Sequence, residues 1–245
     1  MNRIAVVTGA SSGIGAATAR ALVTDFTVFC LARRADRIEA LAEEIGGVAI
    51  TCDVSDPAQV ARASQVIGDR VDVLVNNAGF ALGQEPLEVD DLTAWSRMYE
   101  VNVVGAARMT QALLPALRAA HGTVVFMSST AAEAAYEGGG GYCGVKSAVR
   151  SMAGALRLEL AGEPIRVCEI SPGMVHTEEF SLTRFGGDAA RVDAVYAGVA
   201  EPLLAEDIAD AIAWMVTRPP HVNIDRMVVR PLAQAANHKV ARVSS

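Results

Sequence analysis

The hydrophobic positions of the chain form short apolar runs and helical repeats that alternate from residue 3 to residue 230. Short runs rich in β-branched residues predict strands at 3–7, 26–32, 48–51, 71–75, 123–128, 165–170 and 227–230. Apolar residues with helical spacing predict helices at about 16–24, 35–45, 92–101, 102–119, 141–161 and 205–217, and a helix start near Pro57. Strands that alternate with helices are typical of a parallel sheet covered on both faces, with the ligand at the carboxyl ends of the strands.

No internal repeat, low-complexity linker or break in composition divides the 245 residues, so the sequence predicts a single α/β domain, 1–245. Residues 174–200 show only weak periodicity. We expect this segment to form a lid over a pocket, where binding residues often lie.

The charge balance limits the classes of partner. Lys and Arg total 21 against 28 Asp and Glu, a net charge of −7 with no basic run, which argues against a nucleic-acid partner. The N-terminus lacks the features of a signal peptide, and no uncharged apolar segment approaches the ~18 residues that span a bilayer. We therefore expect a cytoplasmic protein with no membrane partner and a small-molecule ligand.

The four cysteines and four histidines are scattered along the chain without the spacing of metal ligands, so no metal site is predicted. In a cytoplasmic chain, isolated cysteines are expected to be small buried hydrophobic residues. These are Cys30, Cys52, Cys143 and Cys168.

A glycine-rich turn, TGASSGIG from Thr8 to Gly15, follows the first predicted strand. Glycines let the backbone approach a pyrophosphate closely, and the N-terminus of the following helix offers it unpaired N–H groups and a partial positive charge. The spacing is GxxxGxG rather than GxGxxG, so a plain tight turn stays open as the alternative. As a phosphate site the turn would use Gly9, Ser11, Ser12, Gly13, Ile14 and Gly15.

Two arginines, Arg33 and Arg34, follow the second strand, and Arg33 stands twenty residues beyond Gly13. NAD-selective folds place a carboxylate in this region for the ribose 2′-hydroxyl, whereas an arginine pairs with the 2′-phosphate of NADP. The sequence therefore favours NADP, with NAD as the weaker alternative. The opposing interpretation is that the arginines only solvate the next helix, paired with Asp36 or Glu39.

Small and polar residues follow the third and fourth strands as well. Asp53 and Val54 come after the third strand, and Asp53 is expected to face an adenine. In the stretch NNAG at 76–79, we expect Asn76, Ala78 and Gly79 to form a wall against which a cofactor packs.

Tyr142 and Lys146 stand four apart in a predicted helix, so their side chains should share one face. A phenol has a pKa of about 10 and a nearby ammonium lowers it, so Lys146 is expected to make Tyr142 a general acid or base. Ser129 is expected to hydrogen-bond the oxygen on which Tyr142 acts. Asn102 interrupts a helical run, and its amide is expected to hold a carbonyl open for water near Lys146. Taken alone, the YxxxK spacing also fits surface residues on an ordinary helix.

Taken together, the motifs resemble those of the short-chain dehydrogenase/reductases in both order and spacing: TGASSGIG, NNAG, Asn102, Ser129, YCGVK at 142–146 and SPG at 171–173. The resemblance implies an NAD(P)-dependent oxidoreductase with a Rossmann-type, doubly wound sheet of seven parallel strands. It assigns proton transfer to Tyr142, orientation of the carbonyl or alcohol to Ser129, and a water-linked proton relay to Asn102. Lys146 would bind the nicotinamide ribose and lower the pKa of Tyr142.

The same resemblance implies further cofactor contacts from Pro172, Gly173, Val175 and Thr177. Members of the family are commonly tetramers or dimers, so a homo-oligomer is expected.

A closer similarity to the NADP-dependent 3-hydroxy acid dehydrogenases lies in NNAGFALGQEP at 76–86, EFSLTRFGGD at 179–188 and PPHVNI at 219–224. Substrates of that group, such as serine, allo-threonine and 3-hydroxypropionate, carry a carboxylate one carbon from the reacting centre. Arg184 is expected to clamp it, and an exposed structural arginine is the alternative. Some NADP-preferring relatives have a basic residue where this chain has Ser12, which leaves phosphate selection to the two arginines of the second strand.

Other functions stay open at this point, because His176 could alter the substrate pocket. The same tetrad would serve a ketone or 3-oxoacyl reductase or a carbonyl reductase of secondary metabolism. A non-catalytic NADP-responsive protein and a structural subunit built on this fold are the non-enzymatic alternatives.

Overall fold

A computed structural model describes residues 3–243 of the chain. Its centre is a seven-stranded sheet in the order β3-β2-β1-β4-β5-β6-β7, in which every neighbouring pair is parallel. The strands are β1 Ile4–Thr8, β2 Thr27–Ala32, β3 Val48–Thr51, β4 Val73–Asn76, β5 Thr123–Met127, β6 Arg166–Pro172 and β7 Met227–Val229. The predicted sheet of seven parallel strands is confirmed, and its strand order reverses between β1 and β4, where such folds bind ligands.

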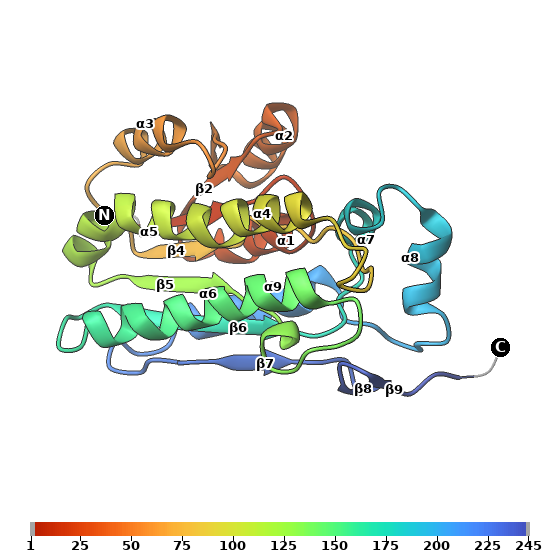
Figure 1. The fold of residues 1–245 in the computed structure, drawn as a ribbon. Helices are drawn as coiled ribbons and strands as arrows, with labels where there is room; N and C mark the ends of the chain where they lie inside the picture. Colours follow the sequence, from red (N-terminus) through yellow and green to blue (C-terminus); the bar gives the residue numbers. More distant parts are fainter. Residues whose placement is uncertain (1–2, 244–245) are drawn as a thin grey trace.

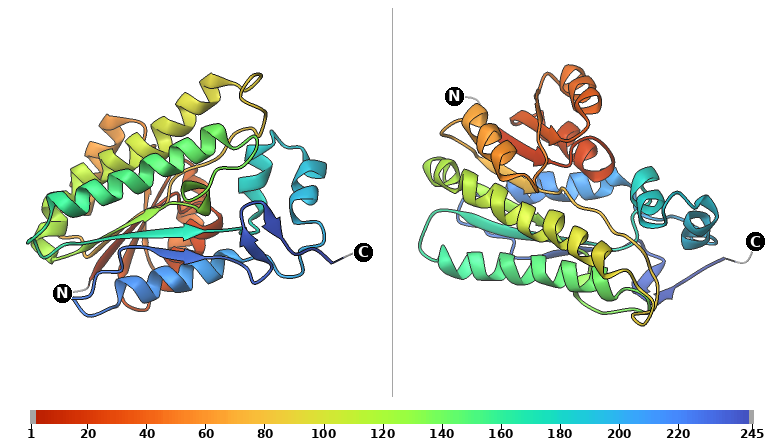
Figure 2. Two further views of the ribbon diagram at one scale, coloured as in Figure 1. Left: turned by 60° about the horizontal axis from the view of Figure 1, so that its bottom comes forward. Right: turned by 45° about the horizontal axis from the view of Figure 1, so that its top comes forward.

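Helices cover both faces of the sheet (Figure 2). One face carries α1 Gly13–Leu22, α2 Ala35–Ile45 and α9 Ala205–Val216; the other carries α3 Pro57–Ile67, α4 Leu92–Tyr99, α5 Ala106–Ala120 and α6 Gly140–Glu159. Side chains alternate between the two faces along each strand, so Val6 packs into one core while Ala5 and Val7 pack into the other. This two-sided burial explains why the strands read as continuous apolar runs.

The helical stretch that the sequence divides at Asn102 contains a π-helix, η1 Glu100–Gly105, between α4 and α5. The Asn102 amide donates to the carbonyl of Met98, 2.9 Å away, four residues earlier in the chain. A π turn holds one residue more than an α turn and often marks a functional site. Asn102 therefore lies inside the irregular turn rather than at a boundary between two helices.

The 174–200 segment stands beyond the carboxyl ends of the strands, as α7 Glu178–Arg184 and α8 Ala189–Tyr196 (Figure 1). It is tied to the loop after β4, because the N–H of Gly83 donates to the carbonyl of Arg184 at 2.9 Å. Arg191 and Glu85 add an ion pair of 3.1 Å between the same two segments. The segment therefore lies above the sheet edge at which the predicted site residues meet.

After β7 the chain forms a short antiparallel ribbon of β8 Gln234–Ala236 and β9 Lys239–Val240, which the sequence analysis did not predict. Within residues 3–243, none of the helices combines the length and apolarity that a membrane crossing requires.

Candidate active site

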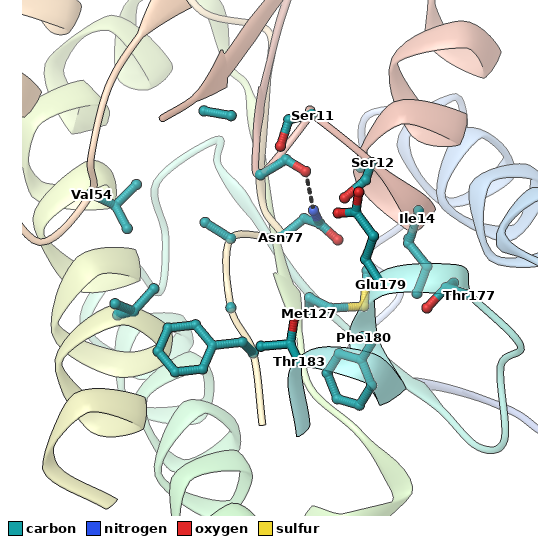
Figure 3. A pocket seen from close by; sticks show the side chains of 18 of the residues that line it. Ser11, Ser12, Ile14, Val54, Asn77, Met127, Thr177, Glu179, Phe180 and Thr183 are labelled. Carbon is teal, nitrogen blue, oxygen red and sulfur yellow. Dashed lines mark hydrogen bonds between the residues drawn. The ribbon is translucent and has the colours of Figure 1, made fainter. Parts of the chain in front are cut away.

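A cavity of about 400 Å³ opens at the carboxyl ends of the strands, between the glycine turn, the start of α6 and α7. Its walls include these residues expected from the sequence: Gly9, Ser11, Ser12, Gly13, Ile14, Gly15, Arg33, Arg34, Asp53, Val54, Ala78, Gly79, Ser129, Tyr142, Lys146, Pro172, Gly173, Val175 and Thr177. The walls also include residues that the sequence analysis did not single out, such as Asn77, Met127, Glu179, Phe180 and Thr183 (Figure 3). Asn76, Asn102 and Arg184 lie outside this wall.

The glycine turn brings its backbone against the end of β4. Gly9 and Gly13 have φ of 68° and 51°, which favour glycine. A Cβ on Gly15 would lie 2.2 Å from the carbonyl oxygen of Gly9, so this close approach requires glycine. The side-chain amide of Asn77 donates to the carbonyl of Thr8 at 2.9 Å and fixes the turn to the neighbouring strand.

The first turn of α1 faces the cavity without a side-chain cap. Ser12 is its N-cap residue, but its hydroxyl makes no capping hydrogen bond to the N–H groups that follow. Those N–H groups are orphan donors at the positive end of the helix, which suits a bound phosphate. The turn and the helix start therefore fit the diphosphate of a dinucleotide.

Of the two arginines after β2, Arg34 is the one that faces the serines of the glycine turn. Its guanidinium donates to the hydroxyls of Ser11 at 2.8 Å and Ser12 at 2.9 Å, and to the Glu179 carboxylate at 2.7 Å. Arg33 is exposed, although it borders the cavity. The predicted site for a 2′-phosphate therefore centres on Arg34.

The partners of these arginines differ from the alternative considered from the sequence. Within residues 3–243, no ion pair joins Arg34 to Asp36 or Glu39. Glu179, which is 145 residues away in the chain, binds Arg34, and Arg37 donates to the same carboxylate at 3.0 Å. The hydrogen bond from Arg34, with Ser12 and Arg37 adding to it, lowers the pKa of Glu179 to about 2. The carboxylate is therefore charged at neutral pH.

The assignment of Asn76 to the cofactor wall is wrong. Asn76 is the last residue of β4, and its buried amide donates to the hydroxyl of Thr110 on α5 at 2.8 Å. Successive strand residues face opposite ways, and the next asparagine, Asn77, reaches the cavity. Asp53 does border the cavity, but its carboxylate accepts hydrogen bonds from the N–H and hydroxyl of Ser55 at 2.9 and 2.6 Å.

Tyr142 and Lys146 lie one turn apart on α6, at the base of the cavity. The Lys146 ammonium donates to the carbonyl of Met127, at the end of β5, at 3.0 Å and lies 5.7 Å from the centre of the Tyr142 ring. Ser129, which follows the same strand, lines the same cavity, and its hydroxyl donates to the Pro172 carbonyl at 3.4 Å. The sheet and the helix thus bring together three of the four predicted catalytic residues.

The pKa values of this pair differ from the expectation. Burial raises the pKa of Tyr142, and the neighbouring Tyr136 raises it further. The Ser129 hydroxyl and the charge of Arg184 lower the pKa and offset only part of this increase. Burial also lowers the pKa of Lys146 to about 8. The net shift of the Tyr142 pKa is upward because desolvation dominates it, and the lowering expected from Lys146 stays a prediction.

The side chain of Asn102 lies behind the cavity wall rather than in it. Its amide nitrogen donates to the carbonyls of Met98 and Phe80, the second at 3.1 Å. Its oxygen is buried and has no hydrogen-bond partner among the described residues. That oxygen packs against Gly79, where an added Cβ would lie only 2.3 Å from it. The expected water-binding role of Asn102 stays a prediction.

Arg184 ends α7 beside the tyrosine. Its guanidinium carbon lies 5.6 Å from the centre of the Tyr142 ring, and the group donates to the Tyr136 hydroxyl at 3.0 Å and the Gly83 carbonyl at 3.1 Å. Part of its donor set is thus used within the protein, and its expected role as a carboxylate clamp stays a prediction.

All four cysteines are buried and free, as expected. Within residues 3–243, no group of three His, Cys, Asp or Glu side chains could hold a metal ion.

Comparison with known proteins gives consistent similarities. The model of the short chain dehydrogenase family matches residues 3–184. An uncharacterized oxidoreductase of Mycobacterium tuberculosis is 52% identical over 236 residues, which cover 96% of this chain and 93% of that protein. A serine 3-dehydrogenase of Agrobacterium fabrum is 41% identical over 251 residues, which cover both chains completely. Among solved structures, the closed form of serine dehydrogenase complexed with NADP+ has a TM-score of 0.92 at 33% identity and covers 98% of this chain and 100% of that one.

Proposed function

The chain belongs to the short-chain dehydrogenase family, and from that premise we propose that it is an NADP-dependent oxidoreductase that interconverts a 3-hydroxy acid and the corresponding carbonyl compound. The complete overlap with a serine 3-dehydrogenase and the similarity to an NADP+ complex of serine dehydrogenase support this proposal.

The residues of the cavity fit NADP. The uncapped start of α1 and the crowded turn at Gly9 and Gly15 would hold the diphosphate. Arg34, together with the hydroxyls of Ser11 and Ser12, would hold the 2′-phosphate. When bound, NADP supplies the nicotinamide that exchanges a hydride with the substrate carbon.

Tyr142 is proposed as the proton donor in reduction and the proton acceptor in oxidation. Because its pKa is raised, the phenol is protonated at neutral pH, which is the form needed to donate a proton to a carbonyl oxygen. The Ser129 hydroxyl, which lines the same cavity as Tyr142, would orient the same substrate oxygen. The Lys146 ammonium is held at Met127 beside the cavity, where it would bind a ribose hydroxyl.

The substrate proposal depends on one observation, the position of Arg184 relative to Tyr142. A guanidinium 5.6 Å from the tyrosine ring would place an anionic group near the carbon on which Tyr142 acts. Arg184 binds Tyr136 and Gly83 through its Nη2 and Nε atoms, which holds the guanidinium in a fixed orientation. A carboxylate one carbon from the carbinol would suit this distance better than an apolar chain.

The first experiment is a substrate panel followed through the nicotinamide absorbance, with NADP+ and NAD+ in parallel. L-Serine, L-allo-threonine and 3-hydroxypropionate represent the proposed class, and simple ketones and 3-oxoacyl thioesters represent the alternative reductases. We expect oxidation of a 3-hydroxy acid with NADP+ as the better cofactor. Efficient reduction of the ketones or thioesters, without turnover of any hydroxy acid, would contradict the proposal.

The second experiment tests the clamp. Arg184→Ala should raise KM for the hydroxy acid by about ten- to hundredfold, the range for a hydrogen-bonded charged contact. It should leave KM for the methyl ester of the same acid nearly unchanged, because the ester has no carboxylate. Arg191→Ala, which removes the ion pair with Glu85 from the same segment, is the matched control. If Arg184→Ala leaves KM for the acid unchanged, the clamp is wrong.

A further inference from the structure

Glu179 is the feature of the cavity that neither the family motifs nor the proposed chemistry explains. It lies on α7, and its side chain points toward the hydroxyl of Ser12 at the glycine turn (Figure 3). Both of its carboxylate oxygens bind Arg34, at 2.9 and 2.7 Å. A second arginine, Arg37, binds one of those oxygens from the first turn of α2.

The carboxylate of Glu179 and a 2′-phosphate would use the same donors. Arg34 is the cation proposed to bind the phosphate, and in this structure its Nη2 atom contacts Glu179 and both serine hydroxyls. Arg–carboxylate and Arg–phosphate pairs both use the planar fork of the guanidinium, so the two anions compete for it. Placing both on one arginine would also bring two negative groups together.

Glu179 has another partner to which it can turn. Arg37 is about half exposed and binds one carboxylate oxygen of Glu179 at 3.0 Å. Arg37 borders a second hollow, which Glu179 also lines, beside the start of α1. The carboxylate can therefore release Arg34 and keep Arg37.

We propose that Glu179 is an internal competitor of the 2′-phosphate and lowers the preference of the enzyme for NADP over NAD. This inference rests on the proposed NADP-dependent function. An NADP molecule must displace Glu179 from Arg34, whereas an NAD molecule, which has no 2′-phosphate, can bind while the pair stays intact. Since Glu179 belongs to α7, phosphate binding also releases one of the contacts that hold the 174–200 segment to α2.

The test is a direct measurement of dinucleotide binding by isothermal titration calorimetry, without substrate. Glu179→Gln keeps the shape of the side chain and removes its charge. Side-chain exposures of 41% for Arg34 and 34% for Glu179 place the pair in the range of a partly screened ion pair. We therefore expect NADP+ to bind about two- to fivefold more tightly to the variant and NAD+ to change by clearly less than this.

Glu85→Gln is the matched control, because it removes the same charge and breaks another ion pair of the 174–200 segment, with Arg191. It should change the affinity for neither dinucleotide by more than about twofold. Adenosine 2′,5′-bisphosphate and AMP serve as a second pair of probes, since they contact the adenosine end alone. Glu179→Gln should strengthen binding of the bisphosphate and leave AMP unchanged.

The outcomes separate the two proposals. If the wild type binds neither dinucleotide, the proposed function fails. If the wild type binds NADP+ and Glu179→Gln changes NADP+ and NAD+ by the same factor, or neither, the competitor role is wrong. If Glu179→Gln does not fold, Glu179→Asp, with a carboxylate one methylene shorter, should give a smaller gain of the same sign, and no gain would overturn the inference.

Discussion

Replacing Lys146 by methionine tests whether burial in the cavity wall destabilises the charged form of this lysine. Its side chain is about 5% exposed, and burial lowers its pKa from 10.5 to about 8. At pH 7 the folded protein therefore carries an ammonium in a place that disfavours charge. Methionine is unbranched and similar in length, so Lys146→Met removes the charge and fills most of the same space.

The size of the effect follows from proton linkage. Between pH 8 and 10.5 the unfolded chain binds the lysine proton and the folded chain does not, so wild-type stability rises with pH in this window. Each pH unit there corresponds to about 1.4 kcal/mol, so the ammonium costs the folded state about 3 kcal/mol at pH 7. The lost hydrogen bond to the Met127 carbonyl opposes this gain by about 1–3 kcal/mol. We expect Lys146→Met to be about 0–2 kcal/mol more stable than the wild type at pH 7.

The decisive measurement is the pH dependence of the difference between the two proteins. The free energy of unfolding in urea should be measured for both proteins at equal concentration. Between pH 7 and pH 9.5, its value for the wild type should rise by about 2 kcal/mol relative to that of Lys146→Met. Other groups that titrate in this range are common to both proteins and cancel in the difference. Parallel stability curves for the two proteins across this range would refute the account, because they would mean that Lys146 is not desolvated.

Three further predictions concern the proposed chemistry and the glycine turn. Tyr142→Phe should lose about 10²–10⁴-fold in kcat while its affinity for NADP+ stays within about threefold of wild type, as measured by initial rates and calorimetry; retained turnover would contradict the role of the hydroxyl. Gly15→Ala should abolish dinucleotide binding, because its Cβ would lie 2.2 Å from the Gly9 carbonyl oxygen; Gly144→Ala, with open space around the added Cβ, is the control for calorimetry. Asn77→Ala should weaken NADP+ binding by about five- to tenfold, since the turn loses its hydrogen bond from the neighbouring strand; unchanged binding would show that the turn holds its shape without Asn77.

Much of the fold could be predicted from the sequence, because the central strands β1, β4 and β5 are buried on both faces and read as apolar runs. The glycine turn could also be predicted from the sequence, because Gly9 and Gly13 adopt backbone conformations that other residues rarely adopt. Such features depend on residues close together in the chain.

The features of the site that the sequence did not predict are of two kinds. Some depend on contacts between residues far apart in the chain, and one depends on which of two neighbouring residues faces the cavity. Asn76 and Asn77 are chemically identical, and only the end of β4 decides which one faces the cavity. Glu179 meets Arg34 across 145 residues, so no local pattern announces it. The raised pKa of Tyr142 depends on the packing around its hydroxyl rather than on its spacing from Lys146.

The π-helix between α4 and α5 holds one residue more than an α-helix needs in this stretch. Deleting one residue between Glu100 and Gly105 would therefore let the stretch close into a continuous α-helix while the faces of α4 and α5 keep their orientation. Met98, which is fully buried and accepts a hydrogen bond from the N–H of Leu82, would stay in the core. A single-residue deletion should therefore be tolerated better here than in the middle of α5, and a deletion scan that shows the opposite would contradict this expectation.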